Sequence, residues 1–336
     1  IIQNVFKMNP NEDNENSTDM LIEESMKKIH YQSYDNWICN FALNLEYIWK
    51  EASANELTPA DDKLVENQKS SAIVIGKGPS LKKFHHLELL RESDYNGTII
   101  CCDGALIDTL KAGVTPEKFP NFLVTTIDTD PGIKKYYDHE LVKKHGQKIK
   151  GVFSILSHPS AVEQARQSGI KIHWVHSLFD YNEGKKSFNY ISSLIIRSKN
   201  HPKGLPAIQT GGNVGTSSWF AAWMILKCST VALIGINHGW EEDDSWDTIT
   251  RHGRMDLSIN IDKNSSSFQK LFPKVFNPDI GKYCILDPIF KFYSTALKEF
   301  ILRSPSWLTT INATEGGSIF GERVKSMTFA EFLKEY

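Results

Sequence analysis

The chain has 336 residues, of which 40% are hydrophobic and 23% are charged, and its formal net charge is −2. This composition is ordinary for a globular protein, and the length allows one large α/β domain with an extension. Proteins that bind nucleic acid through its phosphates are usually basic, so the charge argues against a nucleic-acid partner. No apolar run reaches the about 18 residues that a membrane span requires.

The N-terminus and the cysteines together indicate a cytoplasmic protein. The first residues lack the basic start and apolar stretch of a signal peptide, and the absence of an initiator Met is consistent with the removal of upstream residues. The five cysteines include no C-x-x-C pair, and their odd number suits free thiols in a reducing compartment. His and Cys are not clustered at zinc spacing, so we expect no structural zinc.

Residues 1–65 are interpreted as a partly disordered, helical N-terminal extension. Residues 9–19 are polar and acidic, which is typical of disorder. From Leu21 to about Ala54, apolar residues such as Trp37, Phe41 and Ile48 recur at helical spacing. We expect this stripe to pack on the main body or on another subunit, which leaves a homo-oligomer open.

Residues 66–336 predict a Rossmann-like, doubly wound α/β domain with a mostly parallel sheet. Helical segments alternate with strands that are apolar on both faces, as in a sheet covered on both sides. The predicted strands span 71–75, 97–102, 121–127, 151–156, 172–175 and 231–236. Near the C-terminus we expect a strand, a glycine turn, a short extended piece and a last helix. The long polar stretch at about 240–282 follows a core strand directly, and we expect it to form a lid.

A glycine loop follows the first predicted strand and leads into a helix. It consists of Gly76, Lys77, Gly78, Pro79 and Ser80. Glycines let backbone approach a ligand closely, and a helix N-terminus offers N–H groups to phosphate. The loop lacks the ending of a Walker A motif, and its sixth position is a leucine, so it is no complete G-x-G-x-x-G either. We expect it to bind the phosphates of a nucleotide; the alternative is a tight strand–helix turn.

Polar residues also follow the other predicted strands, where ligands bind in open α/β sheets. Asp103 and Gly104 follow the second strand, and we expect Asp103 to accept hydrogen bonds from ribose hydroxyls, with helix capping as the alternative. A second glycine loop leads into a helix. We expect this loop, together with Asn237 after the sixth strand, to bind an acceptor, a sugar or a second phosphate. The alternative is that the loop is only a helix-entry turn. Its residues are Thr210, Gly211, Gly212 and Asn213.

Asp128 and Asp130 are the candidate metal ligands. On an extended segment, side chains at positions i and i+2 point the same way, and paired carboxylates suit Mg²⁺ bound together with phosphate oxygens. The alternative is that Asp130, which precedes a proline, is only a turn residue. For general acid or base catalysis we consider His158, His176 and His238, and we favour His238 because it adjoins the polar stretch.

These motifs, in this order, resemble the MptE-like family over roughly residues 70–330. The segments that carry the resemblance are Ile75–Leu81, Cys102–Ala105, Asp128, Thr210–Val214, Leu233–Gly235 and Asn312–Gly317. The family includes archaeal 6-hydroxymethylpterin diphosphokinases and motility accessory factors proposed to glycosylate flagellin, and its fold resembles bacterial sialyltransferases.

The resemblance implies a nucleotide or sugar nucleotide as substrate. It implies phosphate contacts for Gly76, Gly78 and Ser80, ligand or metal contacts for Asp103 and Asp128, and an acceptor pocket at the second glycine loop. We therefore expect a transferase that uses Mg²⁺ and ATP to transfer a diphosphoryl group to a pterin-like acceptor. The first alternative is a glycosyltransferase that uses a CMP- or UDP-sugar on a protein or glycan. The second is a non-catalytic nucleotide-binding module.

Overall fold

The computed structural model describes residues 16–59, 70–180, 184–250, 252 and 264–336. Most of the segment expected to be disordered lies outside these residues, but Asn16–Asp19 belong to the long first helix, α2 (Asn16–Lys50). Within the described residues, no helix is both long and apolar enough to cross a membrane.

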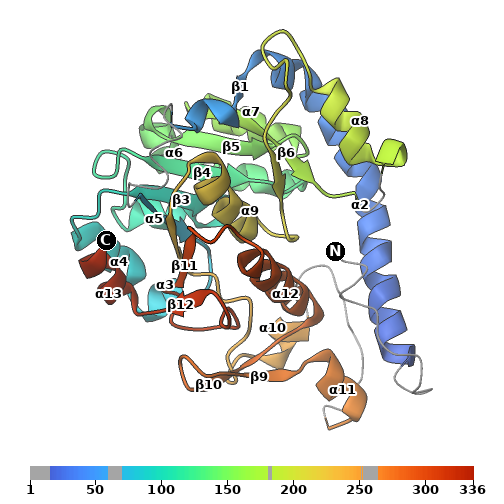
Figure 1. The fold of residues 1–336 in the computed structure, drawn as a ribbon, viewed down its shortest axis with the longest axis vertical. Helices are drawn as coiled ribbons and strands as arrows, with labels where there is room; N and C mark the ends of the chain where they lie inside the picture. Colours follow the sequence, from blue (N-terminus) through green and yellow to red (C-terminus); the bar gives the residue numbers. More distant parts are fainter. Residues whose placement is uncertain (1–15, 60–69, 181–183, 251, 253–263) are drawn as a thin grey trace.

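A ten-stranded sheet forms the centre of the molecule (Figure 1). Its order is β1-β6-β5-β4-β3-β2-β8-β11-β12, with β7 beside β6, and all its pairings are parallel. The strands are β1 (Ala52–Ser53), β2 (Ser71–Ile75), β3 (Thr98–Cys102), β4 (Phe122–Thr126), β5 (Lys150–Ser154), β6 (Lys171–Leu178), β7 (Ala207–Gln209), β8 (Thr230–Ile234), β11 (Thr309–Asn312) and β12 (Val324–Ser326). The Rossmann-like, doubly wound prediction is confirmed.

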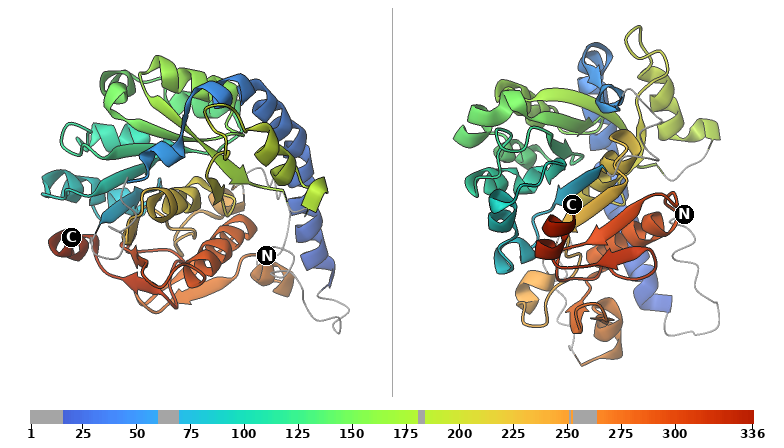
Figure 2. Two further views of the ribbon diagram at one scale, coloured as in Figure 1. Left: turned by 45° about the horizontal axis from the view of Figure 1, so that its top comes forward. Right: turned by 60° about the vertical axis from the view of Figure 1, so that its left-hand side comes forward.

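Helices cover both faces of the sheet (Figures 1 and 2). The face that contains Ile73 and Ile75 also packs against α2, α4 and α13, whereas α9 and α12 pack on the face that contains Val74. After α2, the α-helices of the domain are α3 (Ser80–Lys83), α4 (His86–Glu92), α5 (Leu106–Lys111), α6 (Glu140–His145), α7 (Pro159–Gln167), α8 (Phe188–Ile195), α9 (Val214–Phe220), α12 (Pro288–Leu302) and α13 (Phe329–Glu335).

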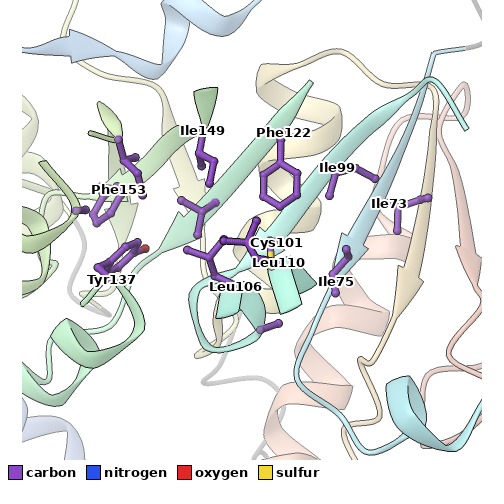
Figure 3. Packing of buried hydrophobic residues seen from close by; sticks show 14 of the residues in the cluster. Ile73, Ile75, Ile99, Cys101, Leu106, Leu110, Phe122, Tyr137, Ile149 and Phe153 are labelled. Carbon is purple, nitrogen blue, oxygen red and sulfur yellow. The ribbon is translucent and has the colours of Figure 1, made fainter. Parts of the chain in front are cut away.

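The pleat of the strands divides the apolar residues between two cores. Ile73, Ile99 and Phe122 belong to one core, which Figure 3 shows from close by, and their neighbours along the strands face the other core. Because both faces are covered, the strands are apolar at nearly every position. This is why their continuous apolar runs could be found in the sequence.

The strand order places a topological switch point between β2 and β8. From β2 the chain proceeds through β3, β4, β5 and β6 to one side, and it then returns to place β8 on the other side of β2. Ligands of open α/β sheets bind outside the carboxyl ends of the strands at such a point. The first glycine loop follows β2 and the segment Gly235–Asn237 follows β8, so both expected segments lie there.

The polar stretch after β8 folds into a small unit with its own core. It contains α10 (Trp246–Thr250), α11 (Ser266–Leu271) and an antiparallel pair, β9 (Lys274–Asn277) with β10 (Lys282–Ile285). Ile249, Phe268 and Phe272 are buried in this core, apart from the two cores of the sheet. A lid function for this segment stays a prediction, and residues 251 and 253–263 lie outside the described residues.

Candidate functional site

The first glycine loop packs against the loop that follows β8. The backbone N–H groups of Gly76 and Gly78 donate to the carbonyl oxygens of Ile234 and Gly235, each at 2.8 Å. A Cβ atom on Gly78 would lie 2.0 Å from Oδ1 of Asn237, so only glycine permits this approach. The glycines thus serve loop packing in this structure, and the two N–H groups that we expected to face phosphate have partners within the protein.

Ser80 and Asn237 lie below the surface, bonded to each other. Both side chains are buried, and Oγ of Ser80 donates to Oδ1 of Asn237 at 2.9 Å. In this structure the two side chains are partners of each other, and their expected ligand contacts stay predictions. Pro79 is exposed and precedes α3, which is only four residues long.

Within this loop, the side chain of Lys77 is exposed to solvent and lies near the ends of the neighbouring strands. Its Nζ atom lies 5.1 Å from the centroid of the Tyr136 ring, and Nζ of Lys135 lies 5.2 Å from the same ring. Gly104 completes this surface, since a Cβ atom there would come within 3.4 Å of Cδ of Lys77. Within the described part of the chain, neither lysine forms a salt bridge, and both ammonium groups lie near the same aromatic ring.

Asp103 is a buried carboxyl group at the end of β3. Its Oδ1 accepts from the backbone N–H of Gly104 at 2.7 Å, and its Oδ2 accepts from Oγ1 of Thr126 at 2.9 Å. Because that hydroxyl donates its hydrogen to Asp103, it accepts the hydrogen bond of the Tyr137 hydroxyl. Burial raises the pKa of Asp103 to about 7, against the opposing effect of these hydrogen bonds.

Asp128 is exposed in the loop after β4 and its charge acts on three neighbours. The pKa values of Asp103, Tyr136 and Tyr293 are raised. Burial is the main cause in each case, and the charge of Asp128 is one of the further causes. Asp128 therefore lies near Asp103, Tyr136 and Tyr293, and we call the area around Lys77, Asp103 and Asp128 the strand-end surface. Its Oδ1 accepts from the backbone N–H of Asp130 at 3.0 Å.

The two aspartates follow β4 in a loop, and Asp130 has the extended backbone angles φ −83° and ψ 134°. Strand β4 ends at Thr126, and Oδ1 of Asp130 accepts from the backbone N–H of Gly132, so that Asp130 caps the 3₁₀ helix η4 (Pro131–Tyr136). Within the described residues, no group of three or more His, Cys, Asp or Glu side chains could hold a metal ion. Mg²⁺ needs no such cage when it binds one or two carboxylates together with substrate phosphates, so Asp128 suits a cation that arrives with a nucleotide.

The second glycine loop packs against α12. Gly211 and Gly212 have φ angles of 53° and 80°, which glycine adopts readily. A Cβ atom on Gly212 would lie 2.7 Å from Cε1 of Tyr293. Asn213 caps α9, with Oδ1 accepting from the backbone N–H of Thr216 at 2.9 Å. The alternative role as a helix-entry turn is thus realised, and Thr210 supports the same turn through a hydrogen bond from the N–H of Gly212.

Tyr293, on α12, is a site residue that sequence reasoning missed. Its ring contacts the second glycine loop, its centroid lies 5.7 Å from that of His238, and its pKa of about 12 reflects burial first and then the charges of Asp128 and Asp287. The tyrosine therefore packs against the loops after β7 and β8. Its sequence context is an amphipathic helix, which gives no signal of a site.

The three candidate histidines lie at different places in the fold, and a role of His238 as general acid or base stays a prediction. His238 is buried with a φ of 41°, and burial, followed by the charge of His252, lowers its pKa to about 3. A group with this pKa is neutral and weakly basic at pH 7. His158 caps α7, and His176 lies inside β6 with its Nε2 2.8 Å from Oγ of Ser192.

An open hollow of about 620 Å³ lies at the amino end of β6, whereas the candidate site lies at the carboxyl ends of the strands. Its charged groups have partners: the Arg166 guanidinium donates to both carboxylate oxygens of Glu51, and Nε1 of Trp174 donates to Oε2 of Glu51 at 2.8 Å. Burial alone would lower the pKa of Arg166, but the bonds to Glu51 and Glu163 raise it. This arrangement fastens the end of α2 to the domain.

No curated protein matches the sequence. Among solved structures, the MAf glycosyltransferase from Magnetospirillum magneticum AMB-1 is similar in fold, with a TM-score of 0.54 and 13% identity. The match covers 78% of this chain and 34% of that protein, so the chain spans about a third of its length.

A family model gives the more specific result. The model described as 6-hydroxymethylpterin diphosphokinase MptE-like matches residues 39–243. This range contains the strand-end surface of Lys77, Asp103 and Asp128 and both glycine loops. The chain belongs to the MptE-like family.

Proposed function

We propose that the protein is a nucleotide-dependent transferase, and that it transfers a diphosphoryl group from ATP to a hydroxymethylpterin-like acceptor. The observation that carries the proposal is the convergence of Lys77, Asp103 and Asp128 at the ends of three adjacent strands, β2, β3 and β4. A cation beside carboxyl groups suits a polyphosphate that brings its own metal ion. The family description supports the choice of donor and acceptor.

Each of these residues has a proposed task. Lys77 and Lys135 bind phosphate oxygens as exposed ammonium groups. Asp128 holds Mg²⁺, which neutralises charge on the phosphates when it is bound. Asp103 and Gly104 line the nucleotide side of the surface, and the second glycine loop with Tyr293 lines the acceptor side. In the reaction, the acceptor hydroxyl oxygen bonds to the β-phosphorus of ATP, and the bond from that phosphorus to the oxygen bridging the α and β phosphates breaks. AMP leaves with the bridging oxygen, and the hydroxyl proton is released to water.

The test combines wild-type protein, ATP, Mg²⁺ and 6-hydroxymethyl-7,8-dihydropterin, with AMP and pterin diphosphate quantified by anion-exchange chromatography. We expect both products in equal amounts. Lys77→Ala removes a charged phosphate contact, so kcat/KM falls by about 10- to 100-fold. The matched control is Lys82→Ala, which removes an exposed lysine from the adjacent α3. AMP formation equal in wild type and Lys77→Ala contradicts the proposed site.

Glycosyl transfer is the second candidate, and the fold similarity to a MAf glycosyltransferase favours it. In that case the donor is a CMP- or UDP-sugar, the acceptor is a protein or glycan, and the segment after Trp240 helps to hold that acceptor. A thermal-shift comparison of ATP, CMP and UDP separates the candidates, because a ligand that binds the native state raises the melting temperature. Stabilisation by CMP and not by ATP reverses the order. Turnover of any donor excludes the third candidate, a non-catalytic nucleotide-binding module.

A further inference from the structure

Helix α2 is hydrogen-bonded to the loop that carries Asp128. The indole Nε1–H of Trp37 donates to Oγ1 of Thr129 at 3.1 Å. One turn further along α2, the buried Asn40 donates from Nδ2 to the carbonyl oxygens of Thr129 at 3.2 Å and of Leu156 at 3.1 Å. Both the hydroxyl and the carbonyl group of Thr129 are therefore held by the N-terminal helix.

The neighbouring loop after β5 is held from the same helix. Nδ2 of the buried Asn44 donates to the carbonyl oxygen of Ser157 at 2.8 Å. Oγ of Ser157 donates to the carbonyl oxygen of Thr126 at 3.1 Å, and the backbone N–H of His158 donates to that of Asp128 at 3.2 Å. The loops after β4 and β5 are thus bonded to each other and to α2. Losing a donor would leave buried carbonyl groups unpaired, so these bonds define where the loops lie.

We propose that α2 is a positioning element of the site, in which Trp37 and Asn40 hold Thr129 so that the Asp128 carboxylate faces the ligand. The proposal rests on the proposed function, because it gives Asp128 a task in transfer. Coupling between loop and carboxylate is direct, since the backbone N–H of Asp130 donates to Oδ1 of Asp128 at 3.0 Å. Trp37 lies two residues before the range that the family model matches, so its bond belongs to the extension.

The test deletes one hydrogen bond and keeps the aromatic packing. Trp37→Phe removes the donor while leaving a ring beside Phe179, whose centroid lies 4.9 Å from that of Trp37. Trp49→Phe is the matched control, because Trp49 lies on the same helix and donates from Nε1 to the carbonyl oxygen of Ile195 on α8, at 2.9 Å. Thr129→Val removes the same bond from the loop side and serves if Trp37→Phe does not fold.

Two readouts decide the outcome: hydrogen exchange at the backbone amide of Asp130, and steady-state kinetics. In Trp37→Phe and Thr129→Val we expect this amide to exchange about tenfold faster, because the loop opens more often. We expect kcat to fall by about tenfold with KM for the nucleotide changed by less than about twofold, because Asp128 is displaced while Lys77 is not. Trp49→Phe should resemble wild type in both.

Unchanged exchange at Asp130 in both variants would overturn the proposal, whatever the activity. Faster exchange with an unchanged kcat would also overturn it, because the bond would then be structural only. A wild-type protein that turns over no donor would overturn the proposed function alone, since the exchange pattern still decides whether α2 positions the loop.

Discussion

The carboxyl group of Asp103 is buried, and within the described residues no charged group is hydrogen-bonded to it. Its hydrogen bonds come from a hydroxyl and a backbone N–H, which are weaker partners for a carboxylate than a salt bridge is. Desolvation therefore dominates and brings the pKa to about 7, so the carboxyl group changes charge in the physiological range. A bound cation beside Asp128 would favour the ionised form of Asp103 and couple nucleotide binding to proton release.

The pKa of Asp103 predicts a particular pH dependence of stability. The folded pKa of about 7 lies above the unfolded value of 3.8, so between these values the folded state keeps a proton that the unfolded state has lost. The free energy of unfolding should therefore fall as pH rises from about 4 to about 7, by on the order of 1 kcal/mol per pH unit. Asp103→Asn should remove this slope in urea unfolding at pH 5, 6, 7 and 8, whereas Asp94→Asn, at an exposed position, should keep it. An unchanged slope in Asp103→Asn contradicts the assignment.

At the scale of elements, the two loops that flank the switch point are packed as one unit. Two backbone hydrogen bonds join the loop after β2 to the end of β8, and the bond between Ser80 and Asn237 locks them below the surface. This packing sets the position of Lys77, whose neighbours on both sides are glycines. The close packing of the two loops requires glycine at these positions, and a phosphate contact of the loop stays a prediction.

Gly78→Ala tests this packing. The new methyl group would overlap Oδ1 of Asn237 and lie 2.7 Å from the carbonyl oxygen of Gly235, so the loops must separate. We expect the free energy of unfolding to fall by about 1–3 kcal/mol. Gly104→Ala is the control, since its methyl group meets only movable side chains at 3.4 Å or more, and its effect should stay within about 1 kcal/mol. Equal stabilities in urea unfolding would show that the loops separate easily.

At the scale of the whole molecule, the segment after β8 has a hydrophobic core of its own beside the large domain. Its core is formed by its own residues, among them Trp246, Ile249 and Phe268. Its link to the domain includes Asp287, whose Oδ2 accepts from Nε1 of Trp240 and lies 2.6 Å from Nδ1 of His252. A homo-oligomer through the N-terminal helix stays a prediction at this scale.

Phe268→Ala should loosen this unit alone. Deleting a buried phenylalanine side chain costs about 3–5 kcal/mol, which exceeds what a small core supplies, so the unit should open locally. We expect faster proteolysis within residues 240–287 and an unchanged main unfolding transition. Phe276→Ala is the control, because Phe276 lies in β9 with 47% of its surface exposed. A lower midpoint of the main transition in Phe268→Ala would show that the segment folds together with the sheet.

The sequence by itself predicted the central strands of the sheet, their order along the chain and the residues at their ends, but it predicted neither β1 nor β7. These features follow from burial on both faces and from turn chemistry, which are properties of neighbouring residues. Lys77, Asp103 and Asp128 could be named for this reason.

Only the tertiary structure decided which of these groups remain available to a ligand. Ser80 finds its partner 157 positions away in Asn237, and Trp37 finds Thr129 across 92 positions. Desolvation and hydrogen bonding depend on such distant neighbours, which no local pattern records. Ser80 is consequently internal, Asp103 has a pKa near neutrality, and a helix read as an extension lies against the candidate site.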